Sequence, residues 1–477
     1  MWKICLCSLI SLLSGFLFNI HPIVFFVFAG VFFYGIILVR FPEIALLLTI
    51  LVIFNCFSMI SENMLRLPFL FRLRDVMLLS MFFPFLAGVY ERDERIKNVF
   101  RSPIAKVILC ISFIVLFQLF LTKIRFPQES VNSMLRMGRK YFYYCLFFPA
   151  FYILQDQIKL QRFLKISIST IVIFAVLYII QFFVSSSIVL FPYGRVALQN
   201  LSGVTINRLY ITGGVSVTFL FQVLLMLILF GKQKRKRLMF FLVILFGFQT
   251  VLTFGRAHIF GVFAGIIFAL ILSKEMGRFK KVFLSVSCFV LITGIFSLGF
   301  AAFFPEKRNP VEVVGSRIVS TFDAVVNKTD TFGVRLEDSA GRIDLLKRYP
   351  IAGIGFLHDE ADMFGYNKGT ISRSFRTTDS GILSLLMDFG LLGFGVLLIL
   401  SFLFLKRAMS LYRRLDSAYS RALVLGVVSF YFGRLFSFIT LADFVTYDGI
   451  VVITLSLVIL ELIVIKERDN AVIHNCC

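Results

Sequence analysis

Residues 380–405 read SGILSLLMDFGLLGFGVLLILSFLFL, a stretch in which Asp388 is the only charged residue. About 20 such residues suffice to cross the hydrocarbon core of a bilayer as an α-helix. Backbone amides find no water there, so the segment must pair its own amides and fold as a helix. Similar runs recur along the whole chain and predict an all-α, polytopic transmembrane helical bundle.

The composition agrees, because hydrophobic residues fill 59% of the 477 positions and the mean hydropathy is +0.91. We predict about 14 spans, with ends good to a few residues. They are residues 4–20, 22–39, 42–60, 69–90, 103–122, 140–155, 162–184, 209–231, 238–253, 257–273, 282–304, 380–405, 421–441 and 448–465. Residues 185–208 are mixed in character and are expected at the membrane interface.

These spans divide the chain into four parts. About 11 spans lie in residues 1–304 and three in residues 379–465. Between them we predict an external loop of residues 305–378, and after them a cytoplasmic tail of residues 466–477. Both termini are expected in the cytoplasm.

The net charge of +22 is better explained by membrane topology than by a nucleic-acid partner. Its densest cluster, KQKRKR at residues 232–237, follows a span directly and marks a cytoplasmic loop. One loop breaks this rule, because it is basic and the topology puts it outside; it contains Lys123, Arg125, Arg136, Arg139 and Lys140. Arg72, Arg74 and Asp75 stand near the start of another span.

Cofactor and metal motifs are not apparent. The eight cysteines are scattered, with no ligand spacing and no disulfide pattern. A Walker or dinucleotide loop is missing as well. Residues 358–362 offer His358 and three acidic residues, a weak metal candidate because one histidine is involved and no ligand spacing repeats. We expect no cofactor and no metal.

Residues 253–258 read TFGRAH and join two spans almost without a loop. Arg256, at the end of this tight hairpin, presents a donor fork suited to phosphate oxygens. The alternative is an interfacial anchor that reaches towards the lipid head groups.

A second candidate region runs from Arg335 to Gly355. Arg335 and Arg342 are seven residues apart, hence on one face of a helix, with Asp338 within reach of both. Two interpretations are open. The arginines bind an anion, or they belong to a solvated surface that contains an ion pair. The turn Pro350–Gly355 should end that helix, and its glycines allow close backbone approach.

Asp379 and Ser380 stand at the outer start of a span, just after Arg373 and Arg376. Aspartate and serine are natural N-caps, which is one interpretation of the pair. The other is a general base beside a basic, phosphate-binding patch.

Together these motifs resemble the O-antigen ligase and O-antigen polymerase superfamily, bacterial membrane glycosyltransferases of the GT-C type. Residues 253–257 are similar to its hairpin turn, with Gly255 and Ala257 in place of the usual serine and glycine. The family's helix-to-Pro-x-x-Gly-x-Gly pattern is similar to Arg335 followed by Pro350–Gly355, and Leu391–Gly393 closes it. Asp379 falls where members usually have histidine, and Ser380 where they have asparagine, which favours a polymerase over a ligase.

The resemblance implies a GT-C-like fold and transfer of a glycan from undecaprenyl diphosphate to a sugar hydroxyl, on the external face of the bacterial inner membrane. It implies that the diphosphate binds Arg256, Arg335, Arg342 and Arg376, and that Arg256, Arg335 and Asp379 are catalytic, with Asp379 accepting the proton. The implied partners are the lipid-linked oligosaccharide, the bilayer, and a chain-length regulator and flippase of the same pathway. Nucleic acid is not among them.

Three other functions remain open. A ligase would move the glycan to a lipid core or a protein with the same chemistry. A transporter or flippase of lipid-linked sugars would place its charges in a cavity between spans, and would need no long external loop. A cell-division or cell-wall polymerase is the third.

Overall fold

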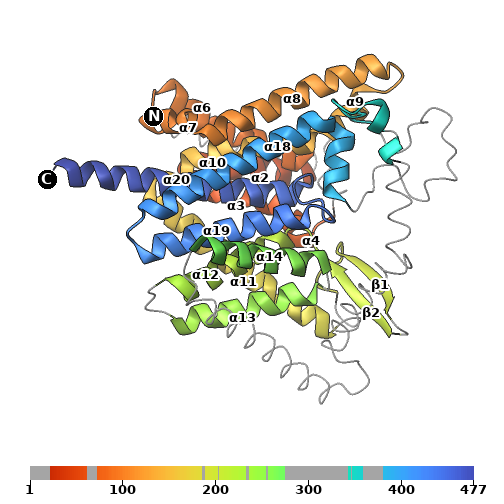
Figure 1. Cartoon of the computed structure of the whole chain (residues 1–477). Helices are drawn as coiled ribbons and strands as arrows, with labels where there is room; N and C mark the ends of the chain where they lie inside the picture. The colour runs from red at the N-terminus through yellow and green to blue at the C-terminus, as the bar shows by residue number, and fades with distance from the viewer. Residues whose placement is uncertain are drawn as a thin grey trace.

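The computed structural model describes residues 22–61, 72–184, 189–201, 204–231, 236–253, 256–273, 342–344, 346–357 and 380–476. These ranges form a helical bundle with one β-hairpin at its end (Figure 1). The elements are α2 (Pro22–Arg40), α3 (Pro42–Ile53), α4 (Asn55–Ser58), α5 (Leu73–Ser80), α6 (Phe82–Tyr90), α7 (Glu94–Arg101), α8 (Pro103–Arg125), α9 (Val131–Gly138), the 3₁₀ helix η1 (Arg139–Leu146), α10 (Phe147–Leu154), α11 (Gln157–Val184), β1 (Arg195–Leu201), β2 (Val204–Tyr210), α12 (Gly214–Phe230), α13 (Lys236–Leu252), α14 (Arg256–Ser273), α18 (Gly381–Arg414), α19 (Ala418–Ser437) and α20 (Tyr447–Cys476). The predicted helical bundle is confirmed.

Five helical stretches of the described chain are long and apolar enough to cross a membrane: Leu73–Tyr90, Pro103–Arg125, Gln157–Gln181, Gly381–Arg414 and Tyr447–Arg468. Shorter apolar helices of 10–17 residues accompany them, among them α12 and most of α14. The predicted spans 4–20 and 282–304 lie outside the described residues. The count of about 14 spans therefore stays a prediction.

Residues 185–208 are expected at the membrane interface, and part of this region is a β-hairpin. β1 and β2 pair antiparallel, from Arg195 opposite Tyr210 to Leu201 opposite Val204. Tyr178 on α11 donates a hydrogen bond to the Leu209 carbonyl (3.1 Å), which ties the hairpin to the bundle. The hairpin is thus an exception to the all-α class.

The predicted span 140–155 is also unusual. It consists of η1 followed by the short helix α10, and every residue of α10 is buried. With the rises of 3₁₀ and α helices, the two together extend about 28 Å, close to the thickness of the hydrocarbon core. This segment runs through the middle of the protein and faces other helices instead of lipid.

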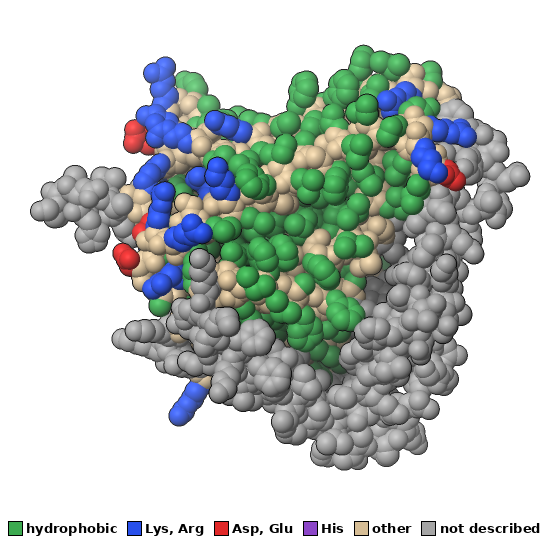
Figure 2. All heavy atoms as spheres, in the orientation of Figure 1, with side chains coloured by type: hydrophobic (Ala, Val, Ile, Leu, Met, Phe, Trp, Pro, Cys, Tyr) green, Lys and Arg blue, Asp and Glu red, His purple; other side chains and the backbone are tan. Residues whose placement is uncertain are grey.

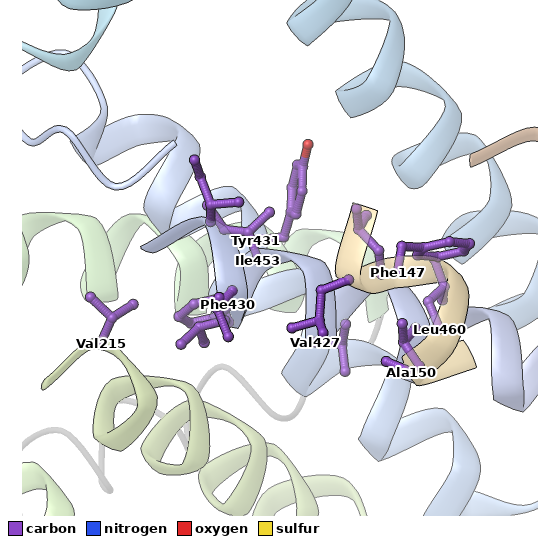
Figure 3. Packing of buried hydrophobic residues seen from close by; sticks show 14 of the residues in the cluster. Phe147, Ala150, Val215, Val427, Phe430, Tyr431, Ile453 and Leu460 are labelled. Carbon is purple, nitrogen blue, oxygen red and sulfur yellow. The ribbon is translucent and has the colours of Figure 1, made fainter. Parts of the chain in front are cut away.

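The core fills the space between α10, α12, α19 and α20, and Phe147, Val215, Phe430 and Ile453 belong to its one large cluster of buried residues (Figure 3). Small residues bring α14 and α19 especially close. A Cβ on Gly265 would lie 2.0 Å from the Ser429 carbonyl oxygen, and one on Gly433 would lie 2.5 Å from that of Gly261. Close approach through small residues is typical of helix pairs in membranes.

The bundle has two distinct ends. We call one the hairpin end, because β1, β2, α9 and residues 346–357 gather there, at the right of Figure 1. The other, the basic end, holds α7 and the end of α20, joined by a hydrogen bond from Arg468 to Asn98 (2.9 Å). Figure 2 shows lysine and arginine side chains gathered at this end; the exposed ones include Lys97, Arg101, Lys106, Lys406, Arg413 and Arg414.

Candidate active site

The turn Pro350–Gly355 lies against α18 where that helix is broken. Gly390 has φ of 62° and ψ of −154°, so the helical hydrogen-bond ladder is interrupted there. Backbone hydrogen bonds cross the junction in both directions, from Ile354 N to Met387 O (2.8 Å), from Leu391 N to Pro350 O (2.9 Å) and from Leu392 N to Ile351 O (3.0 Å). The two motifs that the sequence analysis placed about 40 residues apart are therefore one structural unit.

Two glycines make this junction possible. Gly353 has φ of 66°, and a Cβ there would lie 2.5 Å from the Gly390 nitrogen. A Cβ on Gly390 would lie 2.4 Å from the Gly353 nitrogen. Both the positive φ and the contact exclude a side chain, which confirms the predicted close backbone approach of the turn.

Helix α8 holds the other side of the turn. Gln118 Nε2 donates to the Ala352 carbonyl (2.8 Å), and Arg125 Nη1 donates to that of Gly353 (2.7 Å). The Phe356 N–H donates to the Thr122 hydroxyl (3.2 Å). Arg125, one of the basic residues that broke the charge rule, thus has a role in fixing the turn.

The predicted helix before Pro350 is present, because residues 342–344 and 346–348 are helical. Arg342, the first described residue of this helix, is only 2% exposed. Leu346 and Tyr349 pack into a small apolar cluster with Ile354, Leu357, Phe126, Leu383 and Met387. This burial rules out the interpretation of Arg342 as part of a solvated surface.

A buried polar network begins at His258, two residues into α14 from Arg256. Its Nε2 lies 2.6 Å from the Thr218 hydroxyl on α12. Arg434 on α19 donates from Nη1 to His258 Nδ1 (2.9 Å) and to Asp443 Oδ2 (3.0 Å). Since Arg434 is 0% exposed, the network locks three helices and the loop after α19 together.

Helix α18 starts beside the same end of α19. Ser380 is its N-cap, and the Ser380 hydroxyl accepts from the Leu383 N–H (3.3 Å). The Ile382 N–H donates to the Phe438 carbonyl (3.1 Å), just beyond α19. Of the pair Asp379–Ser380, it is Ser380 that caps the helix.

Residues 442–448, which comprise the loop before α20 and the first two residues of that helix, join this network to a second one. Asp443 belongs to the Arg434 network, while Tyr144 donates to the Phe444 carbonyl (3.0 Å). The Gly213 N–H donates to Asp448 Oδ2 (3.1 Å). Burial raises the pKa of the Asp443 carboxyl, and the Arg434 guanidinium opposes that rise.

The second network, here called the Asp75 cluster, consists of Arg72, Arg74, Asp75, Arg139, Tyr143 and Tyr447. Arg139 donates from Nη1 to Asp75 Oδ2 (3.0 Å) and from Nε to the Tyr447 hydroxyl (3.1 Å). Tyr143 donates to Asp75 Oδ1 (2.6 Å). The Arg74 guanidinium lies 3.8 Å from the centroid of the Tyr447 ring. Burial, with Arg74 and Arg139 alongside, lowers the pKa of Arg72 to about 10.

The predicted site residues are only partly covered by the structure. Arg335, Arg376 and Asp379 lie outside the described residues, and of Arg256 only the backbone, which begins α14, is described. His258 follows Arg256 by two residues, and Ser380 follows Asp379 directly. Both His258 and Ser380 lie at the terminus of α19 that is at the hairpin end. The structure thus brings the α14 turn and the start of α18 to a common neighbour.

The sequence analysis did not select Arg434, Asp443 or Tyr447 as functional. A signal was present, because residues 442–448 place two aspartates and a tyrosine close together where one apolar run ends and the next begins. The basic external loop was a second signal, and it contributes Arg139 to the Asp75 cluster. Neither signal could tell which distant helix would complete the network.

This end of the bundle combines guanidinium groups for binding oxyanions with carboxylates for accepting protons. In the described part of the chain, no group of three or more His, Cys, Asp or Glu side chains could hold a metal ion. The weak metal candidate at residues 358–362 lies outside that part.

Residues 240–398 match the family model described as O-antigen ligase. This range contains most of α13, all of α14, the Pro350–Gly355 turn and the broken part of α18. No curated protein matches the chain.

Proposed function

From its membership of the O-antigen ligase and polymerase superfamily, we propose that this chain is a polymerase of surface-polysaccharide repeat units, of O-antigen or exopolysaccharide type. It transfers a glycan from undecaprenyl diphosphate to a sugar hydroxyl. The bond between the anomeric carbon and the diphosphate oxygen breaks, and one to the acceptor oxygen forms. The acceptor proton goes to a base, and the lipid diphosphate leaves with its negative charge.

The observation that carries this proposal is the meeting of α14 and α18 at the end of α19. His258 contacts Arg434, and the Ile382 N–H bonds to the Phe438 carbonyl, so the first turns of α14 and α18 both contact the end of α19. A leaving diphosphate needs cations placed in advance. Arg256, Arg335, Arg342 and Arg376 fill that role in this proposal.

Asp379 is the proposed base. Ser380 already caps α18, so helix capping does not account for the aspartate before it. A carboxylate beside the arginines that hold the donor is within the class of groups that accept a proton from a sugar hydroxyl. We include Arg256 and Arg335 with Asp379 as catalytic residues.

The proposed orientation puts the hairpin end outside the inner membrane and the basic end in the cytoplasm. Exposed lysines and arginines at the basic end support it, since cytoplasmic loops are rich in them. A cysteine placed within residues 305–378 should react with an impermeant thiol reagent from outside. Labelling only after the inner membrane is permeabilised would show that the orientation is the reverse of the proposed one.

The decisive experiment supplies purified protein with a lipid-diphosphate-linked repeat unit. Wild type should build longer chains, whereas Arg256→Ala and Arg335→Ala should build none while remaining folded. Arg136→Ala is the matched control, because this exposed arginine lies on α9 at the same end. Full-length polymer from the first two variants would exclude the catalytic roles.

The same experiment separates the alternatives. A ligase would transfer the glycan to a lipid core or protein without chain growth, and a flippase would move the substrate without changing it. Asp379 in place of the family's usual histidine is the feature that favours the polymerase.

A further inference from the structure

Arg139 is a partly accessible arginine that the fold holds in one orientation. It is the first residue of η1, and it donates from Nη1 to Asp75 Oδ2 on α5 (3.0 Å) and from Nε to the Tyr447 hydroxyl on α20 (3.1 Å). These contacts come from elements far apart in the chain, and together they fix the plane of the guanidinium. The side chain is nevertheless 14% exposed, so part of it reaches the surface at the hairpin end.

The two residues that orient this guanidinium are themselves held in place. Asp75 accepts from the Tyr143 hydroxyl at Oδ1 (2.6 Å) and from the Arg72 N–H at Oδ2 (2.8 Å). The Tyr447 ring has the Arg74 guanidinium 3.8 Å from its centroid, and it packs edge-on against Tyr143. An arginine with such fixed supports loses little further freedom when it binds a ligand, which is what a substrate-binding residue requires.

The electrostatic potential around this guanidinium is positive, although a carboxylate is present. Burial, and then the positive charges of two neighbouring arginines, lower the pKa of Arg72 to about 10 even though the Asp75 carboxylate lies nearby. In the proposed orientation, Arg139 also belongs to the basic loop that lies outside the membrane, against the charge rule. Topology therefore does not explain these charges, whereas attraction of an anion outside the membrane does.

The substrates of the proposed polymerase carry anionic groups of one chemical kind. The lipid carrier bears phosphate oxygens, and repeat units with acidic sugars bear carboxylate oxygens. A guanidinium binds either oxyanion through charge-assisted hydrogen bonds, often in pairs. Residues 442–448 connect Arg139 with the closed network at the end of α19, because Tyr447 contacts Arg139 and Asp443 contacts Arg434. Arg139 therefore lies at the end of the bundle where the proposed reaction takes place.

We propose that Arg139 is a further substrate-binding residue, which holds an oxyanion of the lipid-linked glycan, and that Asp75 and Tyr447 are its positioning residues. The inference rests on the proposed polymerase for the identity of the substrate. The three residues lie on α5, η1 and α20, outside residues 240–398 that match the family model. Arg139 takes no part in bond breaking, and it contributes affinity and orientation.

Binding measurements in detergent test Arg139 without turnover. A lipid-diphosphate-linked repeat unit should bind Arg139→Gln about 10- to 100-fold more weakly than wild type, the range expected for losing one charge-assisted hydrogen bond. Arg139→Lys should recover part of this affinity, because the positive charge stays. Arg136→Gln is the matched control, since this exposed arginine lies on α9, the helix before η1, and the variant should bind as wild type does.

Two kinds of ligand then identify the oxyanion. Undecaprenyl diphosphate without a glycan tests the phosphate, and two repeat units that differ only in a sugar carboxylate or its amide test the acidic sugar. If Arg139→Gln weakens binding of the glycan-free carrier, Arg139 holds a phosphate. If it weakens binding of the carboxylate form alone, Arg139 holds the sugar carboxylate. Unchanged affinity for every ligand would overturn the inference.

A double-mutant cycle tests the positioning role with a readout that a purely structural role would not change. Tyr447→Phe keeps the ring beside Arg74 and removes only the hydroxyl that accepts from Arg139. It should raise KM for the lipid-linked substrate several-fold without a comparable fall in kcat, and it should have no further effect in the Arg139→Gln background. Equal effects of Tyr447→Phe in both backgrounds would overturn the positioning role. Weaker substrate binding by Arg139→Gln, in a protein whose wild type builds no polymer, would support this site and refute the polymerase.

Discussion

Two arginine networks flank residues 442–448, and they differ in what surrounds the guanidinium groups. Arg434 is 0% exposed and bridges one histidine and one carboxylate. The Asp75 cluster is more open, with the Arg139 side chain 14% exposed and three guanidinium groups around Asp75. The closed network fastens helices to one another, whereas the Asp75 cluster leaves part of the Arg139 side chain accessible. Substitutions should therefore cost stability in the first and activity in the second.

The largest stability loss is expected for Arg434→Met. The substitution leaves Asp443 buried beside α19 without its cation, a change that costs roughly 3–5 kcal/mol. It also removes the donor to His258, next to the Arg256 turn. Thermal unfolding in detergent should show a large decrease in the midpoint. Arg434→Lys should lose less stability, because the positive charge stays. Equal decreases of the midpoint in the two variants would show that the ion pair with Asp443 does not stabilise the protein.

The junction of the turn with α18 also belongs to the closed part. Gly390→Ala should destabilise by roughly 2–3 kcal/mol, because a positive φ and a Cβ 2.4 Å from the Gly353 nitrogen both oppose it. Gly395→Ala is the matched control, since that glycine lies in the same helix and its Cβ would meet nothing within 4 Å. It should be neutral or slightly stabilising. Similar unfolding midpoints for the two variants would contradict the close contact between Gly390 and Gly353.

These two regions also show what the sequence could predict. Apolar runs located α8, α11, α18, α19 and α20 to within a few residues at most ends, because lipid imposes helical pairing on each run by itself. The glycines of Pro350–Gly355 indicated a close backbone approach, but not that the partner would be a break in α18. Residues 442–448 indicated a group of polar side chains, but nothing there or around Arg434 indicated their partners. Their partners come from helices far along the chain, and packing rather than periodicity selects them.

Tyr447→Phe, in the Asp75 cluster, should reduce activity more than stability. The ring remains under Arg74, and only the hydroxyl that accepts from Arg139 is lost. We expect a stability loss of about 1 kcal/mol, the usual value for one hydrogen bond. Chain growth should fall several-fold, because Arg139 loses one of the contacts that orient it. Tyr419→Phe, at an exposed position on α19, should change neither quantity. A large stability loss with unchanged chain growth would place the Asp75 cluster among the closed networks.

The smallest stability effect concerns the start of α18, where capping and catalysis were alternative interpretations of two adjacent residues. Ser380→Ala removes the cap on the Leu383 N–H and should cost about 1 kcal/mol. Ser417→Ala removes the equivalent cap of α19 at the basic end, so it should cost a similar amount without affecting chain growth. Asp379→Asn should leave the unfolding midpoint unchanged and abolish chain growth, because an amide cannot accept the proton. If Asp379→Asn instead lowers the midpoint as Ser380→Ala does and still builds polymer, the aspartate supports the helix and the base must be sought elsewhere. Asp443 would then be the next carboxyl to test, since burial already raises its pKa beside the same end of α19.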